Sequence, residues 1–217
     1  MLSQMRIFTI ILVFGACFLS GCATSRDVVY LATPTTGNFA TSKGIEIYIR
    51  SVVDKRIFEA PPKSPDIPSL DPAEPENDTI KLRAIGRKRN TYGKALGDIL
   101  LNEGQTVESV IYNSLRQAFI ESGYTVIENN SNMSQSSQAV DVQINKFWSW
   151  MNPGFWAITL STEIATDITV KKANEVDKKT IHVKAADNFQ TGVEENSLSV
   201  MNSALKDYVS QVKAKFK

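Results

Sequence analysis

Few side chains in this sequence are of the types that carry out catalysis or bind metal. His182 is the single histidine, and Ile181 and Val183 on either side of it are expected to point inward from a strand, which turns His182 outward. No serine or cysteine is placed by its spacing to act with it as a nucleophile. With one histidine available, a zinc site would need mostly carboxylates, which is an uncommon donor set. We therefore expect no catalytic residue, no metal site and no cofactor.

Three acidic residues keep one enzymatic alternative open. Asp141, Glu163 and Asp167 fall on two neighbouring predicted strands, where their carboxylates could approach one another. Two acids that converge in a pocket can serve a hydrolase as acid and base. Asp141 and Asp167, however, fall on the polar face by parity, and paired carboxylates are common on solvated sheets. A carboxylate-based hydrolase is therefore the less favoured interpretation.

The strongest chemical signal is the tetrapeptide Leu-Ser-Gly-Cys that ends at Cys22. It follows Arg6 and an apolar run over residues 7–18, which has the length and flanks of a cleavable secretory segment. That run is too short to span a bilayer, which takes about 20 residues. The tetrapeptide resembles the bacterial lipobox, whose cysteine is acylated and becomes the first residue of the mature protein. We expect cleavage after residue 21 and a lipid on Cys22; the alternative is a plain signal peptide that happens to contain a cysteine.

The charge balance argues against nucleic acid as a partner. Residues 1–21 hold one charged side chain, Arg6, so the remaining chain carries equal numbers of basic and acidic side chains. No field of one sign steers such a chain toward a polyanion. If Cys22 is lipidated, it is also the only cysteine left, so we expect no disulfide.

The elements that must position any site follow from hydrophobic periodicity. Alternation predicts a strand over 44–53, and a short strand follows at 124–127. Two long strands are expected at 139–150 and 155–170. A three-residue loop, Asn152-Pro153-Gly154, would place the apolar residues of both strands on the same face; the alternative is a bulge near Lys146-Phe147. A last strand is expected around 181–189.

Two amphipathic helices complete the expected fold, at 106–122 and 197–216. Thr106 can cap the first helix, and Gly123 can end it. We expect an α+β fold: a mainly antiparallel sheet of about five strands with two amphipathic helices packed on one face. The expected organisation is a signal peptide at 1–21, a lipidated flexible tether at 22–43 and a single domain at 44–217 with a Pro-rich and basic insertion at 57–105.

Two stretches have no structural role in this scheme and are candidate partner contacts. Arg87, Lys88 and Arg89 lie in a basic run that we interpret as a solvated loop, able to meet phosphate head groups, an acidic partner or the domain's own acids. The second stretch is an aromatic hairpin, whose tryptophans are Trp148, Trp150 and Trp156. Their shared parity predicts packing beneath the helices; the alternative is an exposed hairpin tip that meets a partner or the membrane interface.

These pieces resemble the YajG-like family of bacterial envelope lipoproteins, whose role is uncharacterised. The resemblance rests on the Leu-Ser-Gly-Cys motif, Val53-Asp54-Lys55-Arg56, Ile85-Gly86, Leu115-Arg116-Gln117 and Gly123-Tyr124-Thr125-Val126. The Pro-rich segment at 59–78 is longer than the family pattern. A more distant likeness is to auxiliary lipoproteins of envelope transporters. Neither family implies catalytic residues.

The resulting expectation is a lipid-anchored envelope protein that acts in the periplasm as a non-catalytic binding or scaffold module. Ala23 after the lipidated cysteine favours the periplasmic face of the outer membrane. The expected partners are the membrane, through the lipid, and another envelope protein, with no nucleic acid. The alternatives are an auxiliary subunit of an envelope transport system and the carboxylate-based hydrolase.

Overall fold

A computed structural model describes residues 26–60, 62–71, 77–90, 92, 94–129, 134, 136–173, 175–190, 192 and 194–217. The secretory segment and Cys22 therefore lie outside the described residues. The strands are β1 (Asp27–Val29), β2 (Glu46–Asp54), β3 (Ala84–Arg89), β4 (Ala95–Leu101), β5 (Thr125–Ile127), β6 (Gln138–Pro153), β7 (Ile158–Lys172) and β8 (Glu175–Phe189). The helices within these residues are α2 (Asp78–Arg83), α3 (Val107–Glu121) and α4 (Glu194–Lys215).

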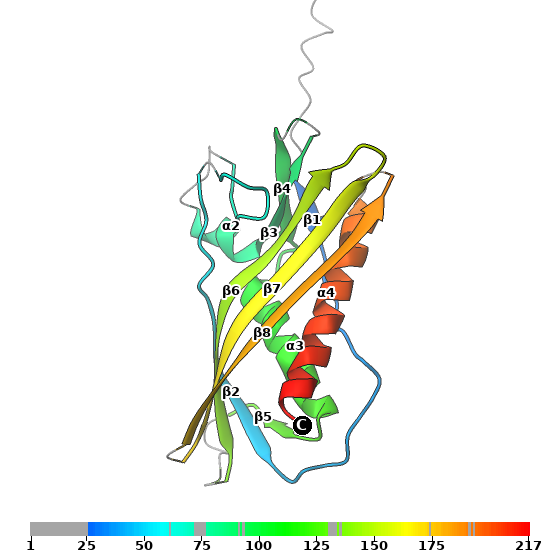
Figure 1. Cartoon of the computed structure of the whole chain (residues 1–217). Helices are drawn as coiled ribbons and strands as arrows, with labels where there is room; N and C mark the ends of the chain where they lie inside the picture. Colours follow the sequence, from blue (N-terminus) through cyan, green and yellow to red (C-terminus); the bar gives the residue numbers. More distant parts are fainter. Residues whose placement is uncertain are drawn as a thin grey trace, which may run out of the picture.

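One mixed sheet of eight strands forms the body of the molecule (Figure 1). β6, β7 and β8 make an antiparallel meander. On the other edge of β6, its first half pairs in parallel with β2 and its second half meets β3. β5 pairs in parallel with β2, β4 is antiparallel to β3, and β1 is parallel to β4.

The expected fold class is therefore wrong. The sheet is mixed and has eight strands, and the described residues form three helices rather than two. Alternation of apolar residues marks a strand but does not identify its partner, so the parallel pairings of β2 left no local signal. Three additional strands and α2 come from the segments interpreted as tether and insertion.

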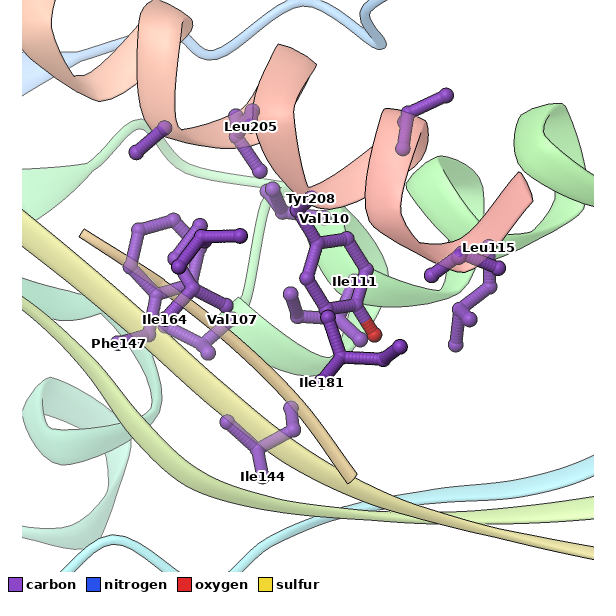
Figure 2. Close-up of a cluster of buried hydrophobic side chains, with 14 of the residues drawn as sticks. Val107, Val110, Ile111, Leu115, Ile144, Phe147, Ile164, Ile181, Leu205 and Tyr208 are labelled. Atoms are coloured by element: carbon purple, nitrogen blue, oxygen red, sulfur yellow. The ribbon is translucent and has the colours of Figure 1, made fainter. Parts of the chain in front are cut away.

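Two helices pack on one face of the sheet and enclose the main core. α3 begins at Thr106, which forms a capping box with Ser109, and α4 lies beside it against β7 and β8. Figure 2 shows side chains of both helices meeting those of the strands over this core. Its fully buried members include the following large side chains: Ile111, Leu115, Phe119, Ile144, Phe147, Ile164 and Tyr208. Inside this core, the Tyr208 hydroxyl forms a hydrogen bond of 3.0 Å with Thr166 Oγ1.

A bulge in β6 changes which residues face that core. The β6–β7 register shifts between Ile144 and Lys146, at the position of the expected bulge. Ile144 and Phe147 consequently face the helices, and Trp148 and Trp150 belong to a separate cluster. The prediction that these two tryptophans pack beneath the helices is therefore wrong.

The Pro-rich segment covers this second cluster. Phe58 packs edge-on against Trp148 with 6.0 Å between ring centroids, and Leu70 is buried beside both tryptophans. Trp148 Nε1 donates to the carbonyl oxygen of Pro65 over 3.1 Å. The segment thus has a packing function, although its composition is that of a disordered loop.

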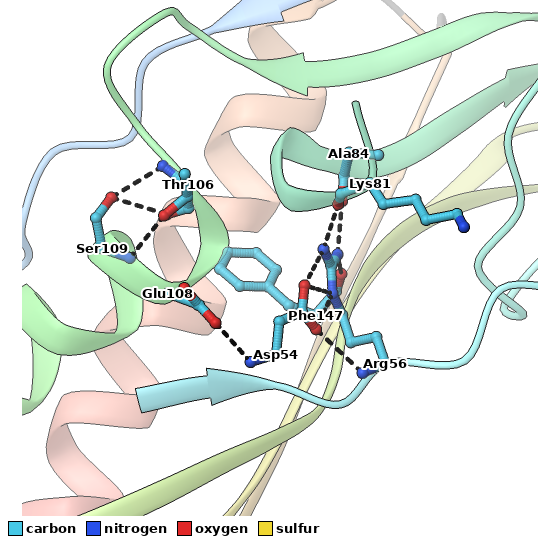
Figure 3. A network of polar contacts seen from close by, with 8 residues as sticks. All are labelled: Asp54, Arg56, Lys81, Ala84, Thr106, Glu108, Ser109 and Phe147. Atoms are coloured by element: carbon cyan, nitrogen blue, oxygen red, sulfur yellow. Dashed lines mark hydrogen bonds and ion pairs between the residues drawn. The ribbon is translucent and has the colours of Figure 1, made fainter. Parts of the chain in front are cut away.

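Arg56, from the Val-Asp-Lys-Arg motif, joins three parts of the chain (Figure 3). Its guanidinium, with no exposed side-chain area, pairs with Asp54 at 2.7 Å. It also donates to the carbonyl oxygens of Ala84 over 2.5 Å, of Phe147 over 3.0 Å and of Lys81 over 2.7 Å. β2, the α2–β3 junction and β6 are therefore held by one buried cation.

Residues 26–43, expected to form a flexible tether, contact the domain along their length. β1 extends the sheet, and Thr36 donates to the buried carboxylate of Glu121. Ala40 N donates to the Glu121 carbonyl over 2.8 Å, and Lys43 Nζ donates to the Phe216 carbonyl over 2.6 Å. Along the sequence, the residues between Cys22 and Asp27, where β1 begins, are therefore all that separate Cys22 from the sheet.

Candidate functional site

Several loops and element ends meet at one end of the sheet, which we call the tip pole. It comprises the β3–β4 turn, the β6–β7 loop, the end of β8 and the start of α4 (Figure 1). Gly86 of β3 pairs in parallel with Ser149 of β6, so both strands run toward this pole. Ile158 at the start of β7 pairs with Phe189 at the end of β8.

A cavity of about 110 Å³ lies at this pole between the sheet and the start of α4. Its apolar lining comes from four elements: Leu96 and Ile99 of β4, Met151 of β6, Leu160 of β7 and Val200 of α4. Polar groups also line it, and Ser149 Oγ and Thr162 Oγ1 bond to each other over 2.8 Å. The volume is comparable with the roughly 150 Å³ apolar cavities that admit benzene. A small ring or a short stretch of hydrocarbon chain fits such a space.

Gly86 allows the strands to approach at the floor of this region. A Cβ at this position would lie 2.8 Å from the carbonyl oxygen of Ser149 and 3.2 Å from the Ile99 side chain. The cavity was not predicted from the sequence, because its lining comes from elements whose pairing has no local signal. Ile85-Gly86 was noted as a motif, and the close approach gives a physical reason for its glycine.

The basic run does not form the exposed loop that was expected. It forms β3, and Arg87 is only 7% exposed. Arg87 Nη1 donates to the carbonyl oxygen of Leu70, and its Nε lies 3.7 Å from Oδ1 of the buried Asp98. Burial raises the pKa of Asp98, and the charge of Arg87 opposes that shift. Arg87 therefore has partners within the fold, and its expected exposure is wrong.

Lys88 and Arg89 also line the cavity and are partly buried. Lys88 Nζ lies 2.7 Å from Oδ1 of Asp27, an ion pair that ties β3 to β1. Burial lowers the pKa of Arg89, and the neighbouring charge of Arg87 lowers it further. Arg87 and Lys88 are therefore paired with acids of the same domain, and a role for the three basic residues as a partner contact stays a prediction.

The three tryptophans occupy two different environments. Trp148 and Trp150 are 0% and 6% exposed, and the ammonium groups of Lys146 and Lys184 lie over the Trp150 ring at 5.5 and 5.1 Å. Trp156, in the β6–β7 loop, is 84% exposed. Only the last therefore offers its ring to a partner.

The carboxylates of the hydrolase alternative do not converge. Asp141 is bonded by Arg50 at 2.7 Å, which lowers its pKa to about 2. Burial alone would raise the pKa of Glu163, but bonds from Lys146 at 2.9 Å and His182 at 2.8 Å hold it below its usual value. Asp141 pairs with Thr169, six residues along β7 from Glu163, a separation of roughly 20 Å.

Asp167 lies nearer to Asp141 but is equally committed to neighbours. Bonds from Thr180 and Asn145, each over 2.7 Å, lower its pKa. A general acid needs a raised pKa, the opposite of what surrounds these carboxylates. Among the described residues, no cluster of three or more His, Cys, Asp and Glu side chains is arranged to hold a metal ion.

Comparisons with known proteins give a family and a fold. A family model described as an uncharacterised lipoprotein matches residues 84–215. No curated protein matches the chain. A solved structure from Xanthomonas campestris is similar, with a TM-score of 0.50, 13% identity, and coverage of 88% of this chain and 94% of the other. A minor lipoprotein from Acinetobacter baumannii matches with a TM-score of 0.34 and 12% identity over 48% of this chain and 80% of its own.

No helix in the described residues is long and apolar enough to cross a membrane.

Proposed function

Because the chain belongs to a family of uncharacterised lipoproteins, we propose that it is anchored by a lipid on Cys22 and acts in the cell envelope as a non-catalytic binding module. The family confirms the resemblance to YajG-like envelope lipoproteins drawn from the sequence. The outer membrane, facing the periplasm, is the proposed location because Ala23 follows the cysteine. An auxiliary role in envelope transport stays a prediction.

The cavity at the tip pole is the observation that carries the binding function. Its walls are mostly apolar, and two of the basic side chains at its edge, Arg87 and Lys88, are paired with acids of the domain. The occupant it suits is therefore an uncharged, apolar group rather than a phosphate or a carboxylate. The transfer of such a group from water into the cavity would be favourable in free energy, and the group would need no charged partner.

The environment of the acidic residues supports the non-catalytic part of the proposal. Asp141, Glu163 and Asp167 all have lowered pKa values, which keep them ionised near neutral pH. Each is bonded to side chains of the sheet, so each has a structural explanation.

Filling the cavity tests the binding function. Ser197 of α4 lines it and is partly buried, whereas Ser203 of the same helix is exposed. We expect saturation-transfer NMR to detect toluene bound to the unmodified protein and to the Ser203→Phe control. Ser197→Phe should abolish the transfer while leaving the circular dichroism spectrum unchanged. Absence of transfer in the unmodified protein, or equal transfer in both variants, would contradict a binding function for the cavity.

A further inference from the structure

The tip pole exposes three aromatic side chains to solvent. Tyr92, Phe155 and Trp156 are 93%, 90% and 84% exposed, whereas Trp150 and Leu160 nearby are each 6% exposed. Phe155 and Trp156 stack edge to face with 4.8 Å between ring centroids. Neither is needed for the core, so their exposure calls for a partner of another kind.

Strand register fixes how far this pole lies from the start of the described domain. Asp27 pairs with Ile99, Ile99 with Gly86, and Gly86 with Ser149, so these four residues lie on one line across the sheet. Pro153 is four residues farther along β6, which is about 13 Å beyond that line. β1 is parallel to β4, and β4 runs away from the β3–β4 turn, so the chain that precedes Asp27 enters from the tip pole.

The chain between Asp27 and Cys22 is short. Five residue steps, even fully extended, span at most about 17 Å. Cys22 can therefore lie no more than about 4 Å beyond the level of Pro153 by the same dimensions. The long tether expected from the sequence would have let the domain move freely above a membrane. The contacts of residues 26–43 remove that freedom.

We propose that the tip pole rests on the phospholipid bilayer that holds the anchor, with Trp156, Phe155 and Tyr92 at the level of the headgroups. This inference rests on the proposed lipid at Cys22. Tryptophan and tyrosine favour the membrane–water interface because their rings are apolar and their polar atoms can stay hydrated. The anchor makes the contact intramolecular, so three rings suffice although they would bind weakly alone.

The charges of the pole indicate that the rings, rather than electrostatics, make this contact. Lys63 and Lys94 are exposed there, but Glu194 and Glu195 are exposed at the start of α4. A surface with both signs has little net attraction to anionic lipid. We therefore expect the contact to persist at high salt and in vesicles without anionic lipid.

Tryptophan quenching by brominated lipid tests the contact. The mature lipidated protein is reconstituted into phosphatidylethanolamine–phosphatidylglycerol vesicles that contain phosphatidylcholine brominated near the headgroup end of its acyl chains. Trp156 should be quenched, whereas the buried Trp148 and Trp150 should not. Trp156→Phe should therefore remove the quenchable part of the emission.

A reporter at the other end of the sheet provides the matched control. Val176, near the start of β8, is 59% exposed and pairs with Lys171, far from the tip pole. In the double variant Trp156→Phe with Val176→Trp, the new tryptophan should not be quenched. Quenching at both ends would mean that the domain has no fixed orientation, and it would overturn the proposal.

Flotation of the same vesicles separates this inference from the anchor on which it rests. If the protein floats with the vesicles and Trp156 is not quenched, the docking inference is wrong and the anchor stands. Failure of the protein to float would refute the anchor and the inference with it. If Trp156 stays unquenched and Trp156→Ser loses a crosslinked envelope protein, the aromatic tip is a protein interface instead of a membrane contact.

Discussion

At the scale of single residues, two arginine–carboxylate pairs with the same chemistry lie in opposite surroundings. Arg56 is buried with Asp54, and Arg50 pairs with Asp141 while 45% of its side chain is exposed. Removing Arg56 leaves the Asp54 carboxylate without its ion pair and takes one donor away from each of three carbonyl oxygens. We predict that Arg56→Ala lowers the free energy of unfolding by about 3–5 kcal/mol. Arg50→Ala should cost under about 1 kcal/mol by urea denaturation. Equal losses would show that Arg56 does not hold the strands together.

Glu121 should make stability depend on pH. Burial alone would raise its pKa, but bonds from Gln117, Lys213, Thr36 and Thr35 lower it well below its usual value of 4.5. The unfolded state therefore binds the proton more readily, so the stabilisation is complete above about pH 4.5 and is lost as the pH falls below that value.

The corresponding variant is Glu121→Gln. At pH 7 it should cost about 2 kcal/mol, because charge-assisted hydrogen bonds are lost. The deficit relative to the unmodified protein should shrink in denaturation curves taken at progressively lower pH. Glu128→Gln, which removes a carboxylate that is 72% exposed, is the control and should have little effect at any pH. A deficit that is constant between pH 7 and pH 3 would rule out this linkage.

At the scale of elements, the Pro-rich segment is part of the fold rather than an appendage. Leu70 is 5% exposed against Trp148 and Trp150, whereas Ile57, just before the segment, is 75% exposed. We predict that Leu70→Ala costs about 2–5 kcal/mol through the cavity it leaves. Ile57→Ala should change stability by less than about 0.5 kcal/mol. If thermal denaturation shows Leu70→Ala to be as harmless as the control, the segment is not a cover for the tryptophans.

The elements with complete local signals could be predicted from the sequence. α3 is one of these: Thr106 caps it, and its apolar residues share one face, as the periodicity indicated. The fold class was not predicted, because β1, β3 and β4 lie in segments that were interpreted as a tether and an insertion. β1 has three residues and β3 is basic, but β4 is largely apolar and could have been recognised as a strand. The bulge in β6 was predicted as an alternative to the loop at residues 152–154. Only the strand register shows that it turns Trp148 and Trp150 to the face of the sheet away from α3 and α4.

The candidate site was predictable only in part for the same reason. Arg87, Lys88, Arg89 and Trp150 line one cavity, although the sequence placed them in two separate candidate contact stretches. The burial of Arg87 depends on Asp98, its neighbour across the β3–β4 pairing, and on Leu70 of the Pro-rich segment, and neither contact was predicted. The composition of the basic run predicted a solvated loop, because composition does not show which acidic residues will lie beside it in the fold.

At the scale of the whole molecule, the exposed aromatic tip and the cavity lie at the end of the sheet from which the chain enters β1, so the proposed anchor would lie near that end as well. The short chain before β1 would keep that end near the bilayer, and the cavity of about 110 Å³ opens among the same loops. A binding module arranged in this way would meet its ligand at the membrane surface rather than deep in the periplasm. All of these consequences depend on the lipid at Cys22.

Intact-mass spectrometry of the protein purified from the cell envelope tests that anchor most directly. The account predicts a chain that begins at Cys22, without residues 1–21, and that carries the added mass of a thioether-linked diacylglyceryl group. Cys22→Ser, expressed in parallel, should lack this mass and should not be cleaved at residue 21. A mature chain with an unmodified Cys22, or one that retains residues 1–21, would contradict the account.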